Sequence, residues 1–226
     1  MEILTQIPFD PDLDSLFNRC SFSKNSGYDI PLREIFEEAC CLANPKAVYR
    51  ELFIDSRGEE TVTMGDVTFT SCILRSNLDR VERVFPYIVT CGRELDQVGV
   101  PENDLLLRFW LEEIRAMILE SSHTWLINFL ERKYSLGKTA RMSPGSGDVN
   151  VWRIEQQKEL FSLFGDVKDC IGVELTESCL MIPIKSISGF LYQTSVEFQS
   201  CMVCHRENCK KRIAPFSKKM WDSLHA

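Results

Sequence analysis

The feature that most constrains the fold is a long helical pattern in the middle of the chain. From Leu105 to Leu130, apolar residues recur at the spacing of a helix, with charged residues between them. This spacing predicts one long core helix, whose Met and Trp side chains pack in the interior rather than bind a cofactor. His123 lies within this pattern, and we interpret it as a structural residue rather than a metal ligand.

Short runs typical of strands surround this helix. They comprise residues 48–54, 67–70, 87–91, 172–182 and 186–192, and further helical patterns cover residues 32–40 and 151–164. Helices and strands mix along the chain without a repeat or a low-complexity linker, which predicts a single compact α+β domain. We divide the chain into an irregular N-terminal segment (1–29), a main domain (30–200) and a Cys-rich basic tail (201–226).

Composition limits the classes of partner. The chain has 226 residues, 44% of them hydrophobic, and a net charge of −7, which argues against nucleic acid as the main partner because phosphate binding needs a cationic face. It contains no apolar run near the ~20 residues that cross a bilayer and no secretory signal, so we expect a cytoplasmic protein without a membrane partner. The tail is basic. This run is either a solvated charged segment or a docking surface for an acidic protein or cofactor.

The segment after the long helix combines a cation with a glycine loop. Arg141 is followed by Ser143, Pro144, Gly145 and Ser146. Arginine can hold a carboxylate through two parallel hydrogen bonds, and the glycines allow the backbone to approach a ligand closely. Such a loop suits a ligand with an amino-acid end and a flat base, although most Pro-Gly loops are merely turns.

Four short motifs in order make the segment more specific. The Arg-x-x-Pro-Gly loop at 141–145 is followed by Leu-Thr-Glu-Ser at 175–178, Met-x-Pro at 181–183 and Ser-Ile-Ser-Gly at 186–189. In this order and spacing the chain resembles the activation domain of vitamin B12-dependent methionine synthase, in a free-standing form. The likeness is strong over roughly fifty residues and looser from Leu78 to Ala140.

This resemblance carries expectations for fold, ligand and function. It implies a mixed or antiparallel twisted sheet with flanking helices, and S-adenosylmethionine bound at the loop with its carboxylate on Arg141. The backbone of Ser143, Pro144, Gly145 and Ser146 would contact the rest of the ligand, with Glu177 and Ser178 nearby. For Glu177, a strand-end carboxylate that caps a backbone amide is an equal alternative.

The resemblance also implies a methyltransferase component that supports the reductive methylation, and thus the reactivation, of cobalamin. None of the three histidines lies in the Asp-x-His-x-x-Gly context of the corrinoid-carrying module. The corrinoid is therefore expected on a partner, either a corrinoid-binding protein or a methionine synthase core, and an electron-donor protein is a further candidate partner.

One departure from the family concerns Ser146, which stands where the family usually has Tyr. A hydroxymethyl group cannot stack on a large macrocycle as a phenol can. This difference favours an alternative function, a non-catalytic adaptor that docks on a corrinoid protein. A third alternative is a redox protein defined by its thiols.

Three of the ten cysteines form a cluster in the tail. Cys201, Cys204 and Cys209 lie within nine residues, a spacing from which thiolates can bind zinc or an iron–sulfur cluster. A fourth ligand could come from His205 or from a distant cysteine such as Cys179. The spacing does not separate zinc from iron–sulfur, and three free thiols are the structural alternative.

Overall fold

The structure is a computed structural model that describes residues 1–20, 27–101, 103–148 and 151–224. Its centre is a six-stranded sheet with the order β1-β2-β7-β11-β8, in which β3 also pairs with β7. All these pairings are antiparallel. The strands are β1 (Glu2–Leu4), β2 (Lys46–Tyr49), β3 (Leu52–Phe53), β7 (Arg83–Thr90), β8 (Thr139–Met142) and β11 (Ser186–Gln193).

The two long neighbours β7 and β11 form the middle of the sheet. They pair from Ser186 opposite Thr90 to Tyr192 opposite Val84, and both are buried over nearly all of their length. A strand buried on both faces must be covered by a layer on each side. The sheet therefore divides the core into two clusters of buried residues.

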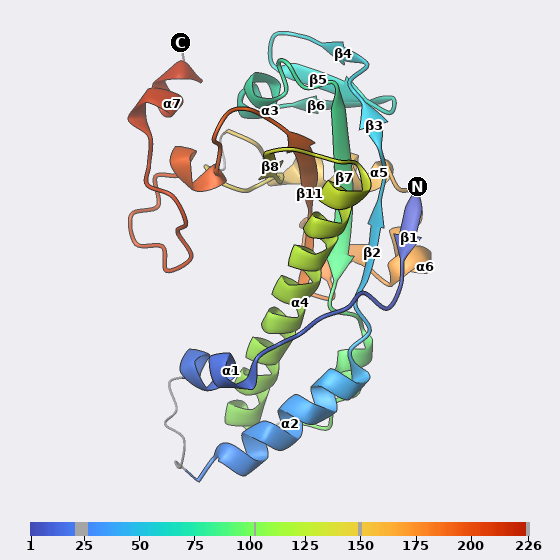
Figure 1. The fold of residues 1–226 in the computed structure, drawn as a ribbon, viewed down its shortest axis with the longest axis vertical. Helices are drawn as coiled ribbons and strands as arrows, with labels where there is room; N and C mark the ends of the chain where they lie inside the picture. Colours follow the sequence, from blue (N-terminus) through green and yellow to red (C-terminus); the bar gives the residue numbers. More distant parts are fainter. Residues whose placement is uncertain (21–26, 102, 149–150, 225–226) are drawn as a thin grey trace.

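The first layer consists of the helices α1 (Leu13–Arg19), α2 (Asp29–Leu42) and α4 (Leu105–Lys133). Helix α4 crosses the sheet diagonally, and α1 and α2 pack on the part of α4 that extends beyond the sheet (Figure 1). The N-cap of α4 is Asp104, whose carboxylate accepts hydrogen bonds from the N–H groups of Leu106 and Leu107. Such a cap satisfies amides that have no partner inside the helix. The long helix predicted from the sequence is thus confirmed, three residues longer at its C-terminal end than the predicted range.

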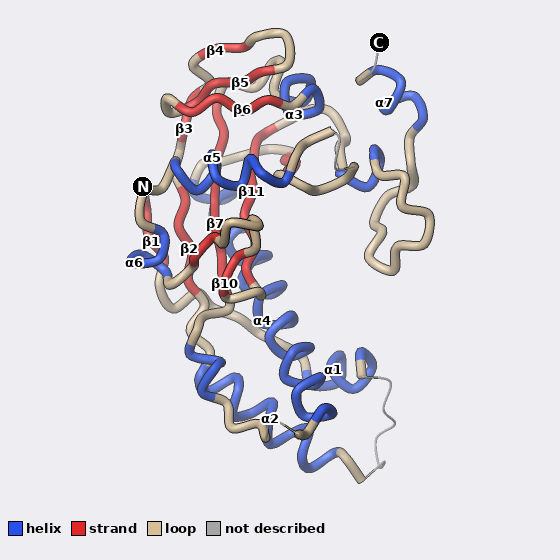
Figure 2. Tube along the Cα trace, turned by 180° about the vertical axis from the view of Figure 1, so that it is seen from behind, coloured by secondary structure: helices blue, strands red, loops and turns tan. Residues whose placement is uncertain are grey.

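The second layer covers the opposite face of the sheet. It contains α5 (Gln157–Ser162) and α6 (Val167–Ile171), seen in front of the strands in Figure 2, and a three-stranded sheet. This sheet is formed by β4 (Ser56–Arg57), β5 (Thr61–Met64) and β6 (Val67–Thr70), next to α3 (Cys72–Asn77). A hairpin of β9 (Glu174–Leu175) and β10 (Met181–Ile182) leads into β11. The predicted α+β class with an antiparallel sheet is confirmed.

Several local predictions differ from the structure. The predicted helix over 151–164 is divided into the 3-10 turn η2 (Ile154–Gln156) and α5. A further 3-10 turn, η1 (Glu94–Gln97), follows β7. Residues 1–29 are not irregular throughout, because they contain β1 and α1. Helix α1 is capped by Asp12, whose side chain accepts from Asp14 and Ser15 N–H groups.

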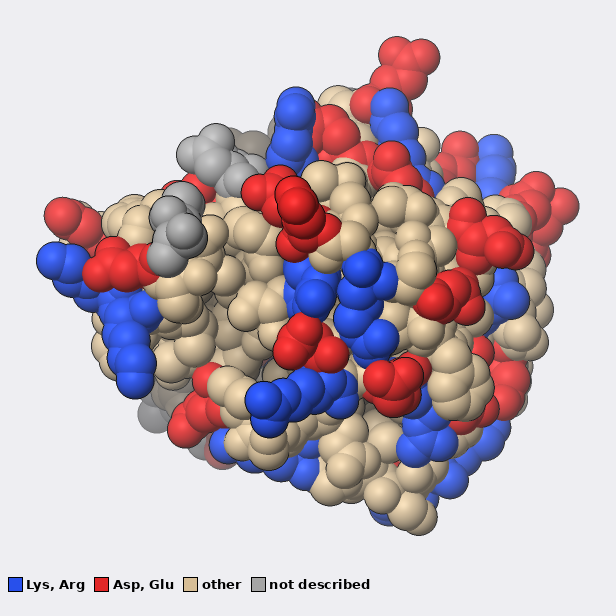
Figure 3. All heavy atoms as spheres, turned by 90° about the horizontal axis from the view of Figure 1, so that it is seen from above, with Lys and Arg blue, Asp and Glu red and all other residues tan. Residues whose placement is uncertain are grey.

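The C-terminal residues fold back towards the glycine loop. They form the 3-10 turn η3 (Ser200–Val203) and the helix α7 (Lys218–Ser223). Met220, Trp221 and Leu224 pack at the edge of the core cluster on the second layer's side. On the face seen in Figure 3, Lys and Arg side chains are interleaved with Asp and Glu.

Within the described residues, no helix is both long enough and apolar enough to span a membrane.

Candidate functional site

Arg141 projects from the edge strand of the central sheet. In β8 its neighbours Ala140 and Met142 are buried, whereas Arg141 is exposed, as the alternation of side chains along a strand requires. Strand β11 fixes this register by pairing Leu191 with Arg141. Among the described residues, none forms a hydrogen bond or an ion pair with the guanidinium of Arg141. The predicted carboxylate-binding group is therefore available.

A buried residue, Tyr87, and a partly buried residue, His123, lie beside this guanidinium. Tyr87 in β7 and His123 in α4 are joined by a hydrogen bond of 3.0 Å between Oη and Nε2. Burial raises the pKa of Tyr87 to about 12, and the charge of Arg141 opposes this shift. Burial lowers the pKa of His123 to about 4, and Arg141 acts in the same direction. His123 is thus neutral at neutral pH, so that Arg141 is the charged member of these three side chains.

Gly189 is the point at which the glycine loop and the central strands meet. A Cβ atom built on Gly189 would lie 2.6 Å from Ser143 Oγ, 2.7 Å from the Met142 carbonyl and 3.2 Å from Tyr87 Oη. The first two separations are too short for a Cβ atom unless its neighbours move. The motif Ser-Ile-Ser-Gly thus ends in a residue that lets the loop after β8 lie directly on β11.

The loop itself is held by hydrogen bonds inside the protein. Ser143 donates from Oγ to the Ser188 carbonyl at 2.6 Å, and the N–H of Ser146 donates to the Ser143 carbonyl at 3.0 Å. The N–H of Gly145 donates to the Trp152 carbonyl at 2.9 Å. The amides of Gly145 and Ser146 are thus already used inside the protein, whereas the Ser146 side chain is exposed.

Gly145 has a backbone conformation that favours glycine. Its φ is +77°, and a Cβ there would lie 2.6 Å from Ile154 Cδ1. L-residues adopt this left-handed region at a cost of roughly 1–2 kcal/mol. The Pro-Gly sequence therefore determines the shape of the loop as well as its open surface.

The C-terminal segment borders the other side of the loop. A Cβ on Gly147 would lie 3.1 Å from the Ser200 carbonyl and 3.4 Å from Val203 Cγ2. Asp148 Oδ2 lies 3.4 Å from His205 Nδ1, and the His205 ring packs against Phe216 and Trp221. The tail that we separated as 201–226 is thus in contact with the loop 143–148.

Glu177 and Ser178 lie in a different element, at the tip of the β9–β10 hairpin. Both are exposed, and Ser178 Oγ lies 3.0 Å from Thr176 Oγ1. No hydrogen bond links either residue to Arg141 or to the loop within the described parts of the chain. Nor does the Glu177 carboxylate cap a backbone amide there, so the alternative interpretation of Glu177 is not supported.

The cysteine triplet does not assemble into a metal centre. Among the described residues, no group of three or more His, Cys, Asp or Glu side chains could hold a metal ion. All three thiols are free and partly exposed. The loop is organised instead by Arg212, whose guanidinium donates to the carbonyls of Cys201, Cys204, Arg206 and Ala214. Among the described residues, the predicted zinc or iron–sulfur site therefore has no geometric support.

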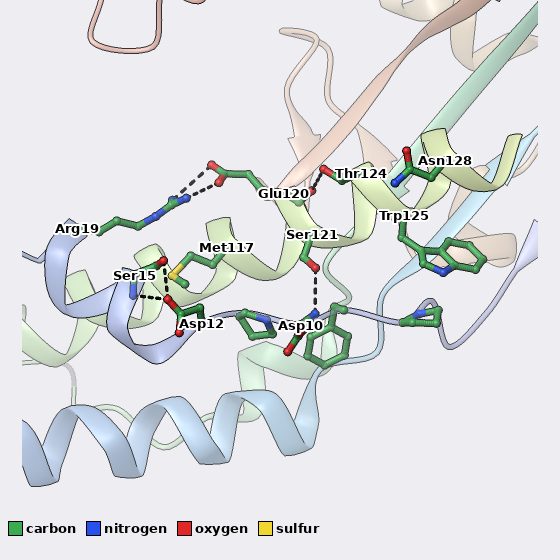
Figure 4. Close-up of a pocket in the computed structure, with 13 residues that line it drawn as sticks. Asp10, Asp12, Ser15, Arg19, Met117, Glu120, Ser121, Thr124, Trp125 and Asn128 are labelled. Carbon is green, nitrogen blue, oxygen red and sulfur yellow. Dashed lines mark hydrogen bonds and ion pairs between the residues drawn. The ribbon is translucent and has the colours of Figure 1, made fainter. Parts of the chain in front are cut away.

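A separate hollow of about 550 Å³ lies between the N-terminal segment and α4 (Figure 4). The N–H of Asp10 donates to Ser121 Oγ at 2.9 Å, and Arg19 pairs with Glu120 across the hollow. Ser121, Thr124 and Asn128 line it from one side of α4, whereas His123 points from another side to Tyr87. The hollow is therefore distinct from the arginine site, and its cation is already paired.

The fold and the site together define an α+β domain with an exposed arginine beside a glycine loop at the edge of its sheet. Residues 128–212 match the family described as vitamin B12 dependent methionine synthase, activation domain. A solved structure described as the MetH reactivation domain bound to AdoHcy is similar, with a TM-score of 0.60 and 13% identity. It covers 88% of this chain, and this chain covers 81% of it. A search of curated proteins finds no match.

These comparisons confirm the resemblance predicted from the four motifs. The family match includes Arg141, the glycine loop, the hairpin and β11, and the structural match extends the same fold over most of the chain. Sequence reasoning missed Tyr87, His123 and the contact between Gly147 and Ser200. The first two looked like ordinary core positions, and their proximity to Arg141 depends on long-range pairing that no local pattern reveals.

Proposed function

We propose that this protein binds S-adenosylmethionine at the arginine site and supports the reductive methylation of a corrinoid carried on a partner protein. Arg141 holds the carboxylate of the ligand. The carbonyls of the loop and the exposed hydroxyl of Ser146 face its remaining polar groups. The observation that carries the proposal is the exposed guanidinium of Arg141, which forms no bond to any described residue and stands next to a loop shaped by Gly145.

The residues of the site fit such a ligand in charge and shape. A guanidinium on a rigid edge strand can bind a carboxylate through two parallel hydrogen bonds. The neutral state of His123 adds no second charge that would compete for it. The similar MetH reactivation domain was solved with AdoHcy, which shares the carboxylate and the adenosine of S-adenosylmethionine.

The chemistry divides between the ligand and this chain. S-Adenosylmethionine would supply a methyl group and leave as S-adenosylhomocysteine, and the partner's corrinoid would accept the methyl group after taking one electron from an electron-donor protein. The part of this chain is to hold the ligand at the sheet edge and to dock on the partner. Glu177 and Ser178, which are exposed at the tip of the β9–β10 hairpin, remain candidate contacts of the ligand.

Titration calorimetry with S-adenosylmethionine tests the binding. We expect micromolar-range affinity for the wild type and a loss of about 10- to 150-fold for Arg141→Ala, because a hydrogen-bonded charged pair contributes about 1.5–3 kcal/mol. Arg33→Ala is the matched control, since Arg33 is an exposed arginine on α2. Equal affinity of the Arg141 and Arg33 variants would contradict the role of Arg141.

A second candidate function is that of an adaptor without methyl transfer. The exposed Ser146 favours it, because a serine cannot shield a macrocycle at this point. An assay that follows the absorbance of a reduced corrinoid protein on addition of S-adenosylmethionine and this chain separates the two. Methylation at an accelerated rate supports the first function, whereas binding without acceleration supports the adaptor.

A further inference from the structure

The Cys-x-x-Cys sequence of the tail forms a closed turn beside the glycine loop. Cys201 lies in η3, and Cys204 follows its end. We propose that Cys201 and Cys204 are a dithiol pair that exchanges with small-molecule disulfides. The disulfide that they form makes residues 200–205, which contact the loop 143–148, more rigid. Formation of the disulfide is independent of the proposed function, whereas the effect of the disulfide on ligand affinity rests on the proposed function.

The backbone already has the geometry that a disulfide needs. The N–H of Cys204 donates to the Cys201 carbonyl at 3.3 Å. A turn closed in this way brings its first and fourth Cα atoms within about 7 Å, and disulfides join Cα atoms about 4.4–6.8 Å apart. Cys201 lies in the 3-10 turn, and Cys204 follows its last residue directly with an extended backbone. A bond between the two sulfurs therefore needs little movement of the main chain.

Arg212 keeps this turn closed while the thiols are reduced. Its Nη1 donates to the Cys201 carbonyl at 3.0 Å, and its Nη2 donates to the Cys204 carbonyl at 3.1 Å. One planar guanidinium thus fixes the two residues that are to be joined. Both thiols are partly exposed, so a dissolved disulfide can reach them.

The turn is in direct contact with the ligand loop through the residues on either side of Cys201. The Ser200 carbonyl lies 3.1 Å from a Cβ built on Gly147, and Val203 Cγ2 lies 3.4 Å from it. His205, the residue after Cys204, reaches Asp148 at 3.4 Å. A covalent bond between positions 201 and 204 therefore stiffens both contacts with the loop at once.

The chemistry balances with an ordinary disulfide oxidant such as oxidised glutathione. One thiolate attacks the oxidant and forms a mixed disulfide, which releases the first glutathione thiol. The second cysteine then displaces the other glutathione thiol and completes the protein disulfide. The two cysteines lose two electrons and two protons, and the oxidant gains them as two thiols.

The pairing is tested by equilibrating the full chain in glutathione buffers, alkylating free thiols and mapping peptides by mass spectrometry. We expect a 201–204 disulfide in the wild type and in Cys209→Ser, and none in Cys201→Ser or Cys204→Ser. Pairing of either residue with Cys209, the absence of any disulfide, or zinc or iron retained on the three thiols would each overturn the proposal.

The effect on the loop is tested by hydrogen exchange of residues 143–148. Exchange should be slower in the oxidised form than in the reduced form, and unchanged rates would overturn the coupling whether or not S-adenosylmethionine binds. If it binds, the oxidised form should bind at least about fivefold more tightly, and the ligand must favour disulfide formation by the same factor. A slower loop with no ligand binding in either form would leave this inference standing and reject the proposed function.

Discussion

Tyr87 and His123 are joined across the interface between the central sheet and α4, with 3.0 Å between Oη and Nε2. The bond lies beside Arg141, whose charge acts on the pKa of both side chains. It fixes a neutral imidazole behind the exposed guanidinium. The Tyr87–His123 hydrogen bond thus connects β7 to α4 behind Arg141. Because it involves an imidazole of lowered pKa, stability should depend on pH.

Stability should fall as pH decreases through the range in which His123 would take up a proton. The folded pKa of His123 is about 4, below the value of about 6.5 in an unfolded chain. Between these values the unfolded state binds more protons, so the free energy of unfolding is highest above about pH 6.5 and declines towards about pH 4. Between about pH 7.5 and about pH 5, the free energy of unfolding of His123→Gln should decrease by about 2 kcal/mol less than that of the wild type. Urea unfolding measures this difference, and equal losses would show that His123 is protonated without cost.

Gly189→Ala should destabilise the fold where the loop after β8 packs on β11. The new methyl group would overlap the Met142 carbonyl and Ser143 Oγ, and backbone atoms cannot move away as the end of a side chain can. We expect a loss of about 1–3 kcal/mol in the free energy of unfolding. Gly99→Ala is the control, because no atom of a described residue lies within 4 Å of a Cβ at Gly99. Similar losses in both variants would contradict the close approach at Gly189.

Gly145→Ala should weaken ligand binding more than it weakens the fold. The substitution forces a left-handed residue with a methyl group against Ile154, and the exposed loop can relax only by changing shape. We expect S-adenosylmethionine affinity to fall about tenfold or more, which corresponds to about 1.4 kcal/mol. Gly165→Ala is the matched control, since Gly165 has a similar φ of +72° with no atom within 4 Å of its Cβ. Loss of affinity in both variants would point to general destabilisation.

Arg212→Lys should loosen the C-terminal loop although the charge is kept. A lysine ammonium cannot reproduce the planar fork that reaches the carbonyls of Cys201 and Cys204. We expect faster hydrogen exchange over residues 201–214 and over the loop 143–148 that contacts them, with the rest of the chain unchanged. Lys211→Ala, an exposed neighbour, should leave exchange at the wild-type rate. Unchanged exchange in Arg212→Lys would show that the loop is held by other contacts.

The sequence predicted the elements whose signals are local. Apolar spacing from Leu105 to Leu130 identified α4, because a helix face repeats within a few residues of the chain. The run from Tyr87 to Cys91 identified the buried strand β7. Four motifs in order then predicted the fold family, since such an order is specific even where each motif is weak.

The remaining features depend on contacts between distant parts of the chain. Gly147 meets Ser200 and Asp148 meets His205 because the tail folds back on the loop, and no periodicity marks such a contact. The metal site was predicted from thiol spacing alone, which cannot reveal that Arg212 binds the carbonyls of the same loop. The resemblance placed Glu177 near Arg141, and this stays a prediction, because within the described residues no hydrogen bond links the hairpin tip that carries Glu177 to Arg141.

The central claim is that Arg141 binds the carboxylate of S-adenosylmethionine, and a double-mutant cycle on that pair tests it most directly. Calorimetry would compare wild type and Arg141→Ala with S-adenosylmethionine and with its decarboxylated analogue, which lacks the partner group. The account predicts a coupling free energy of about 1.5–3 kcal/mol, with Arg141→Ala having little effect on the analogue. Equal losses of affinity for both ligands, or no binding by the wild type, would contradict it.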